Sequence, residues 1–246
     1  MEIYNKDINI IKDYIKQGTV NKGTTIKKLA CDKTWEVTQK ESLVLRSDMA
    51  YELGGGEHEA VSLLAFTTDK ECVADDGVYL IGDDLQDITE DISYARLTFI
   101  RLNAVSIDGK DADSMYAVLR AVDYVRYHNY LKGYMTRISA VKEREPVRVS
   151  QDALDKGMTF AHIGSEMIQA YKKREEVAAV QIIFITDQKA DYQWFRNESH
   201  RCEQITDSLN NIFNGLVMDC STCGSRKLCD EIDGMKELHS GINKSK

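Results

Sequence analysis

Three cysteines near the C-terminal end of the sequence have a spacing that is typical of a metal-binding site. Cys220, Cys223 and Cys229 stand in the sequence MDCSTCGSRKLCDE. Two thiolates with two residues between them can reach one metal ion or cluster, because the tight turn between them brings both sulfurs to the same point. Arg226 and Lys227 place positive charge nearby, which favours thiolate over thiol. We therefore predict that these three cysteines hold a metal ion or an iron-sulfur centre.

Two other interpretations of this pattern stay open, namely thiol redox chemistry and a chance spacing. The ligand count is also incomplete, because a closed 4Fe-4S cluster or tetrahedral zinc site takes four protein ligands and only three are local. Cys202, His200, His239 or a thiolate from another chain could supply the fourth. A site left with three ligands would keep an open position at which chemistry could occur.

The other cysteines and histidines give weaker signals. Cys31, Cys72 and Cys202 are scattered, and we expect them to be buried or inert. The histidines at 58, 128, 162 and 200 are too dispersed for a local ligand pair, so capping or surface roles are expected. The three glycines at 54–56 predict a tight turn, because no GxGxxG or GxxxxGK[ST] pattern follows a strand and opens a helix. No GxSxG, HExxH or CxxCH motif occurs in the sequence.

Composition excludes several classes of protein. The chain has 246 residues, a net charge of -8 and a pI of about 5.2, which argues against general affinity for nucleic acid or anionic membranes. No apolar run approaches the roughly 18 residues that span a bilayer, and the first residues are too charged for a signal peptide. We therefore expect a cytoplasmic protein with reduced thiols and no disulfide framework.

The negative charge is concentrated in one segment. Residues 67–92 hold nine acidic residues and one lysine, while the rest of the chain is balanced. A solvated face around two turns is the favoured interpretation, and a docking face for a basic partner is the alternative.

The hydrophobic pattern predicts an α+β fold with a mixed sheet covered by helices. Helices are expected at 1–17, ending at Gly18, from Asp111 or Asp113 to Gly133, at 151–157 after an N-cap at Ser150, at 159–175 and at 188–213. Strands are expected at 34–38, 42–45, 61–66, 78–81, 96–102 and 147–149, with a buried central strand at 178–186. We divide the chain into an N-terminal helical segment (1–30), an α+β domain (31–213) and a Cys-rich segment with a basic tail (214–246).

Several ordered segments resemble the acetyl-CoA synthase, or beta, subunit of the carbon monoxide dehydrogenase/acetyl-CoA synthase complex. They are YELGGGEHEAVSLLAF at 51–66, VYLIGDDLQDI at 78–88, VRVSQDALDKGMTFAHIGSEMIQAYKKREEVAAVQIIFIT at 147–186, and the CxxC of Cys220 and Cys223. Their order and approximate spacing are similar to those of the family's middle α+β domain and the opening of its metal-cluster domain. The resemblance covers about residues 40 to 230.

This resemblance implies a cofactor and partners. The family's A-cluster joins a 4Fe-4S cubane to a dinickel site, where a methyl group from a corrinoid protein, carbon monoxide and coenzyme A form acetyl-CoA. Cys220 and Cys223 look like the first two cubane ligands, whereas Cys229 sits closer than the family's third ligand. The Cys-Gly-Cys tripeptide that holds the distal nickel in the family is absent from this sequence. Nickel and the complete reaction are therefore not expected of this chain alone.

The leading hypothesis is a shortened acetyl-CoA-synthase-like protein with a Cys-bound iron-sulfur cluster in anaerobic one-carbon and corrinoid metabolism. If it is an enzyme, the resemblance implies a CO-methylating acetyl-CoA-synthase-type acyltransferase. Expected partners are a carbon monoxide dehydrogenase or corrinoid protein, coenzyme A, and a second copy that shares the cluster as a homodimer. The rival hypothesis is a non-catalytic scaffold in which the same cysteines hold structural zinc and the acidic segment docks a partner.

Overall fold

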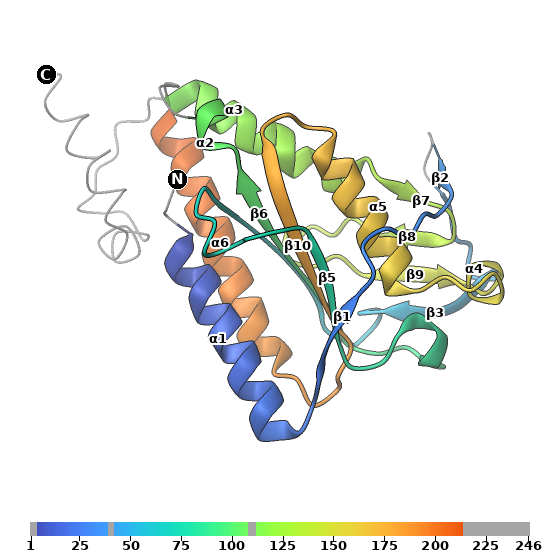
Figure 1. The fold of residues 1–246 in the computed structure, drawn as a ribbon. Coiled ribbons are helices and arrows are strands. Elements are labelled where there is room, and N and C mark those ends of the chain that lie inside the picture. The colour runs from blue at the N-terminus through green and yellow to red at the C-terminus, as the bar shows by residue number, and fades with distance from the viewer. Residues whose placement is uncertain (1–3, 39–41, 108–111, 214–246) are drawn as a thin grey trace, which may run out of the picture.

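Two five-stranded sheets and the helices around them form the part of the chain that the structure describes (Figure 1). This structure is a computed structural model, and it describes residues 4–38, 42–107 and 112–213. The predicted α+β class is confirmed, but the expectation of one sheet is wrong. The second sheet was missed because its strands are two to five residues long, too short for a clear alternating pattern.

The first sheet is mixed and has the strand order β1-β5-β10-β6-β4. The outer pair β1–β5 and the central pair β10–β6 are antiparallel, whereas β5–β10 and β4–β6 are parallel. Its strands are β1 (Ile26–Leu29), β4 (Ala60–Thr67), β5 (Gly77–Ile81), β6 (Tyr94–Leu102) and β10 (Val177–Ile185). β4 is buried along its whole length, and β6 and β10 nearly so, because both faces of this sheet are covered.

The second sheet is antiparallel and has the order β2-β7-β8-β9-β3. Its strands are β2 (Val37–Thr38), β3 (Met49–Leu53), β7 (Tyr130–Leu131), β8 (Tyr134–Thr136) and β9 (Val147–Ser150). One buried contact between the sheets joins the hydroxyl groups of Tyr94 on β6 and Tyr134 on β8, whose oxygens lie 2.9 Å apart. The two sheets therefore share one core.

Helices cover the two faces of the first sheet unequally. α1 (Asn5–Lys22) and α6 (Tyr192–Phe213) lie side by side on one face, where the rings of Tyr14 and Trp194 stack at 3.7 Å (Figure 1). α5 (Phe160–Lys172) packs on the other face through Phe160, whose ring lies 4.5 Å from that of Phe184. The remaining helical elements are α2 (Ala104–Ile107), α3 (Ala112–Asp123), α4 (Gln151–Asp155) and the 3-10 turns η1 (Leu85–Asp87) and η2 (Tyr124–Tyr127). No described helix is both long and apolar enough to cross a membrane.

Local signals predicted several boundaries correctly. The Ser150 side chain accepts a hydrogen bond from the Ala153 amide and caps α4. Gly157 follows that helix with φ 83°, a backbone conformation that favours glycine. The predicted central strand and the two last predicted helices are confirmed as β10, α5 and α6, with boundaries that shift by a few residues.

Three local predictions were wrong. α1 continues past Gly18 to Lys22, since an isolated glycine weakens a helix without ending it, and Gly23 with φ 67° follows instead. The helix expected as far as Gly133 ends at Asp123, after which η2 and the β7–β8 hairpin follow. Residues 42–45 form no strand, although Val44 is buried. In the helix expected as far as Gly133 the apolar pattern indicated burial and not the element type, whereas at 42–45 Leu43 and Leu45 are 69% and 58% exposed.

The predicted glycine turn is confirmed between β3 and β4. Gly54 and Gly56 have φ values of 70° and 57°, and the His58 amide donates to the Gly55 carbonyl at 2.9 Å. A Cβ atom on Gly54 would lie 2.3 Å from the Ala60 Cβ, so a larger residue would clash there. Arg144 closes the turn by donating to the carbonyl oxygens of Gly54 and Gly56, each at 3.2 Å. The turn therefore has a structural role, since it brings β3 close to β4 and is held by Arg144.

Candidate functional site

The predicted metal ligands Cys220, Cys223 and Cys229 lie outside the described residues. Within the described ranges, no group of three or more His, Cys, Asp or Glu side chains could hold a metal ion. Three closely spaced thiols are a soft donor set, which suits zinc or an iron-sulfur cluster better than magnesium or calcium.

The structure removes Cys202 as the simplest fourth ligand. This residue lies in α6 with 1% of its surface exposed. Burial, together with the nearby carboxylates of Asp7, Glu198 and Glu203, raises the pKa of the thiol well above its ordinary value. Cys202 is therefore enclosed by the domain and favours the protonated form, whereas the thiolate is the form that binds metal.

His200 is also occupied within the domain. Its Nδ1 atom lies 2.6 Å from the Glu143 carboxylate, and its Nε2 atom lies 3.1 Å from the Gln204 side-chain nitrogen. Both ring nitrogens therefore have partners, although the side chain is 60% exposed. Of the other predicted fourth ligands, His239 lies outside the described residues.

The remaining cysteines and histidines have structural surroundings. Cys72 is buried, and burial and Asp69 raise the pKa of its thiol, whereas Cys31 is exposed. His162 confirms the predicted capping role, since its Nδ1 accepts a hydrogen bond from the Thr159 amide at the start of α5. His128 lies on the surface and stacks on Tyr124 at 4.2 Å.

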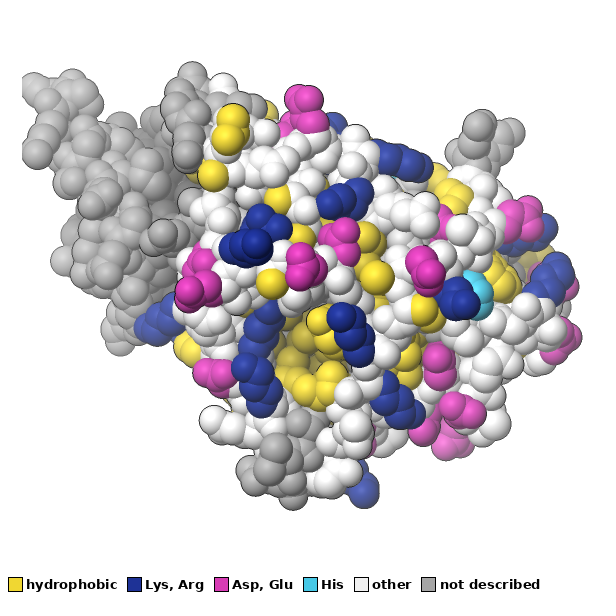
Figure 2. All heavy atoms as spheres, in the orientation of Figure 1, with side chains coloured by type: hydrophobic (Ala, Val, Ile, Leu, Met, Phe, Trp, Pro, Cys, Tyr) yellow, Lys and Arg dark blue, Asp and Glu magenta, His cyan; other side chains and the backbone are white. Residues whose placement is uncertain are grey.

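The acidic segment 67–92 divides into structural and solvated residues. Asp69, Asp76, Asp84 and Asp91 accept hydrogen bonds from backbone amides, and Asp84 binds two of them, Leu85 N at 2.7 Å and Phe160 N at 2.8 Å. Exposed positions are Glu71, Asp75, Asp83, Asp87, Glu90 and Asp91, of which Asp91 also binds an amide. On the face that Figure 2 shows, acidic side chains are interspersed with Lys and Arg. Part of the charge run thus serves to close turns.

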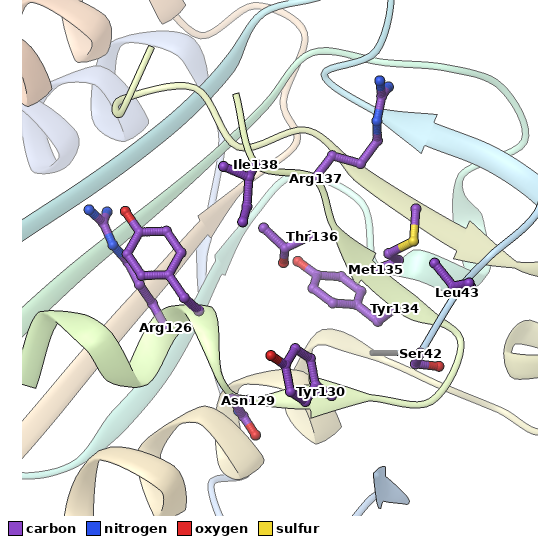
Figure 3. Close-up of a pocket in the computed structure, with 11 residues that line it drawn as sticks. Ser42, Leu43, Arg126, Asn129, Tyr130, Tyr134, Met135, Thr136, Arg137 and Ile138 are labelled. Carbon is purple, nitrogen blue, oxygen red and sulfur yellow. The ribbon is translucent and has the colours of Figure 1, made fainter. Parts of the chain in front are cut away.

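A groove that sequence analysis did not predict lies over η2, the β7–β8 hairpin and residues 137–145. Two adjoining cavities of about 330 and 470 Å³ share Tyr127, Tyr130 and Ile138. Figure 3 shows Tyr130, Tyr134 and Ile138 around the first cavity, and Arg137 extending away from it. We call this surface the tyrosine groove and define it by Leu43, Tyr124, Tyr127, Tyr130, Ile138 and Val141.

A buried ionic junction supports the groove from beneath. Arg96 on β6 forms an ion pair with Glu145, and their side chains are 4% and 5% exposed. Arg126, which lines the groove, binds Asp123 at 2.8 Å, Glu145 at 3.5 Å and Glu203 at 3.4 Å. Burial raises the pKa values of Asp123 and Glu203, although Arg126 opposes this effect. The junction therefore joins β6, η2, α6 and the segment before β9.

The local composition of the sequence could have indicated the tyrosine groove and the ionic junction. Residues 120–148 contain seven Lys or Arg residues against three acidic ones, together with four tyrosines. The overall charge of -8 hides this local excess of positive charge. Which of these cations are buried in the junction and which stay in solvent follows only from the fold.

The fold and the Cys pattern together define an α+β domain joined to a Cys-rich segment. The family model for the CO dehydrogenase/acetyl-CoA synthase complex beta subunit (CdhC) matches residues 37–190. This match covers more than half of the chain, and the protein belongs to that family. The resemblance inferred from the sequence is thereby confirmed. No curated protein matches the chain.

Proposed function

We propose that this protein is an acetyl-CoA-synthase-like subunit that carries a Cys-ligated iron-sulfur centre in anaerobic one-carbon and corrinoid metabolism. The family match over residues 37–190 carries the proposal, because that family is a subunit of a multi-subunit complex. Cys220, Cys223 and Cys229 would hold the centre, most simply a 4Fe-4S cluster, which would supply redox or Lewis-acid chemistry.

The closed α+β domain would position this centre and present it to partners. A carbon monoxide dehydrogenase or a corrinoid protein fits as a partner, and coenzyme A enters the proposal through the family. Because Cys202 is enclosed by the domain, the fourth ligand would come from His200, His239 or another chain. A homodimer that shares the cluster would satisfy the ligand count. The sequence contains no Cys-Gly-Cys, so a dinickel site is not part of this proposal.

Metal analysis on protein purified without oxygen tests the proposal directly. We expect iron and sulfide, with a broad absorption band near about 400 nm. The variants Cys220→Ala and Cys223→Ala should lose both, whereas Cys31→Ala and Cys202→Ala should keep them. Protein without iron, or with iron that survives both CxxC substitutions, would contradict the proposal.

A scaffold with structural zinc is the second candidate, and the exposed acids of segment 67–92 favour it. Stoichiometric zinc in place of iron would support this function. Neutralising Asp75, Asp83, Asp87 and Glu90 should then weaken binding of a basic partner. Asp76 and Asp84 are unsuitable for this test, because their carboxylates bind backbone amides and their loss would disturb the fold.

A further inference from the structure

The tyrosine groove exposes more apolar surface than a closed domain needs. Ile138 is 77% exposed, Leu43 69%, Tyr124 58% and Val141 53%. These side chains gather around two joined cavities and do not stand singly on the surface. Clustered apolar and aromatic side chains beside arginine are typical of the centre of an interface.

The charge around the groove favours an acidic occupant. Arg137 is 45% exposed, whereas Glu52, to which it binds, is 10% exposed. Lys142 on the rim is 50% exposed and pairs with Glu203, which is 14% exposed, and with Asp207, which is 56% exposed. Arg137 is therefore more open to solvent than its partner carboxylate, and Arg144, which lines the groove, donates to the backbone carbonyls of Gly54 and Gly56. A segment that enters the groove should combine apolar anchors with negative charge.

One segment of this same chain has that chemistry. Residues 228–238, LCDEIDGMKEL, contain four acidic residues and one lysine. Their apolar residues Leu228, Ile232, Met235 and Leu238 recur at intervals of three and four, a spacing that puts them on one face of a helix. The exposed residues of the acidic segment 67–92 in a second copy carry charge without comparable apolar anchors.

The path of the chain makes this occupant reachable. Asp207 on α6 binds Lys142 at the rim of the groove, with 2.8 Å between the atoms. α6 continues to Phe213, about 9 Å further along the helix axis. The fifteen residues from there to Leu228 can span up to roughly 50 Å. Residues 228–238 can therefore return to the groove without strain.

We propose that residues 228–238 of this chain occupy the tyrosine groove and thereby dock the Cys-rich segment on the α+β domain. Ile232 and Met235 would fill the two cavities, and the acidic residues would face Lys142 and Arg137. This docking depends on apolar and charge complementarity and holds whatever the cysteines bind. It can therefore fail or succeed independently of the proposed iron-sulfur centre.

Hydrogen exchange of the full-length protein tests the docking. We compare the native chain with the double variant Ile232→Asp/Met235→Asp, and use Ile242→Asp as the matched control outside the segment. Backbone amides of residues 124–145 should exchange roughly tenfold faster in the double variant and unchanged in the control. Metal content, measured on the same samples, should stay the same. Equal exchange in all three proteins would overturn the proposal.

Carbodiimide cross-linking identifies the occupant. This reagent joins lysine amines to carboxylates in contact, so the Lys142–Asp207 pair serves as the internal reference. Links from Lys142 to Asp230, Glu231 or Asp233 would support the proposal if they join residues of one chain. In a mixture of ¹⁵N-labelled and unlabelled protein, links between the two isotopes would assign the groove to a second copy and overturn it. Detection of the reference link alone would also overturn it.

Discussion

The centre of the first sheet and the ionic junction beneath the tyrosine groove are equally buried but held by different forces. Leu97, Phe99 and Phe184 have no exposed surface and contact other apolar side chains. Arg96, Arg126 and Glu145 are 3–5% exposed and depend on one another for charge compensation. Apolar packing is non-directional and loses stability in proportion to the atoms removed, whereas an ionic cluster fails when one partner is lost.

The junction should show the largest effect. Glu145→Ala leaves Arg96 without its buried carboxylate and removes one partner of Arg126, so we expect a loss of about 3–5 kcal/mol in the free energy of unfolding. Urea unfolding followed by circular dichroism measures it. The control is Glu36→Ala, an exposed partner of Lys132, which should cost less than about 1 kcal/mol. Equal losses would mean that the junction contributes no more than a surface pair.

A side-chain truncation at the centre of the first sheet measures how much apolar packing contributes to the free energy of unfolding. Leu97→Ala on β6 should reduce the free energy of unfolding by about 2–5 kcal/mol, through lost burial and the cavity that remains. Leu97→Met should cost less than about 1.5 kcal/mol in the same urea titration, since its volume is similar. Apolar packing should tolerate a change of shape at similar volume. If Leu97→Met is as destabilising as Leu97→Ala, the proposed difference between the sheet centre and the ionic junction is wrong.

A smaller effect is expected where one carboxylate joins two elements. Asp84→Ala removes the acceptor for the Leu85 and Phe160 amides, and we expect a loss of about 1–3 kcal/mol. Asp87→Ala, three residues later and exposed, should change stability by less than about 0.5 kcal/mol. Thermal unfolding of the two variants side by side separates structural acids from solvated ones. A harmless Asp84→Ala would contradict a structural role for this carboxylate.

The smallest effect should be a pH-dependent change in the free energy of unfolding, caused by His162 at the start of α5. Burial, followed by Lys33, lowers the pKa of His162 below its ordinary value of 6.5. The neutral imidazole is thus favoured in the folded state, so its contribution to stability is complete above about pH 6.5 and is lost as the pH falls towards the folded pKa. His162→Gln keeps an acceptor for the Thr159 amide but cannot titrate.

The free energy of unfolding measured between pH 5 and 7.5 checks this prediction. The difference between the native protein and the variant should change through that window by no more than about 1 kcal/mol, the usual value of a helix cap. Lys33→Ala offers a control, because it removes the positive charge and should move the step towards higher pH. Parallel curves for the native and His162→Gln proteins would show that His162 does not titrate during unfolding.

The centre of the first sheet could be predicted from the sequence, whereas the ionic junction could not. The run at 178–186 predicted a buried strand because every residue of a strand covered on both faces meets apolar neighbours, and β10 confirms it. Ser150 and Gly157 marked α4 because capping depends on residues a few positions apart. The junction could not be predicted, since Arg96, Glu145 and Glu203 are distant in sequence and meet only when β6, α6 and the segment before β9 pack together.

The sequence by itself determined the family, the α+β class and the Cys pattern that the proposed metal centre requires. These properties depend on residue types, local spacing and short-range periodicity. Only the tertiary structure decided that Cys202 is enclosed and that His200 is bound to Glu143. It also decided that the tyrosines at 124–134 form a groove beside half-exposed cations. Burial and long-range contact decide whether such side chains can bind a ligand, and both arise only when distant segments pack.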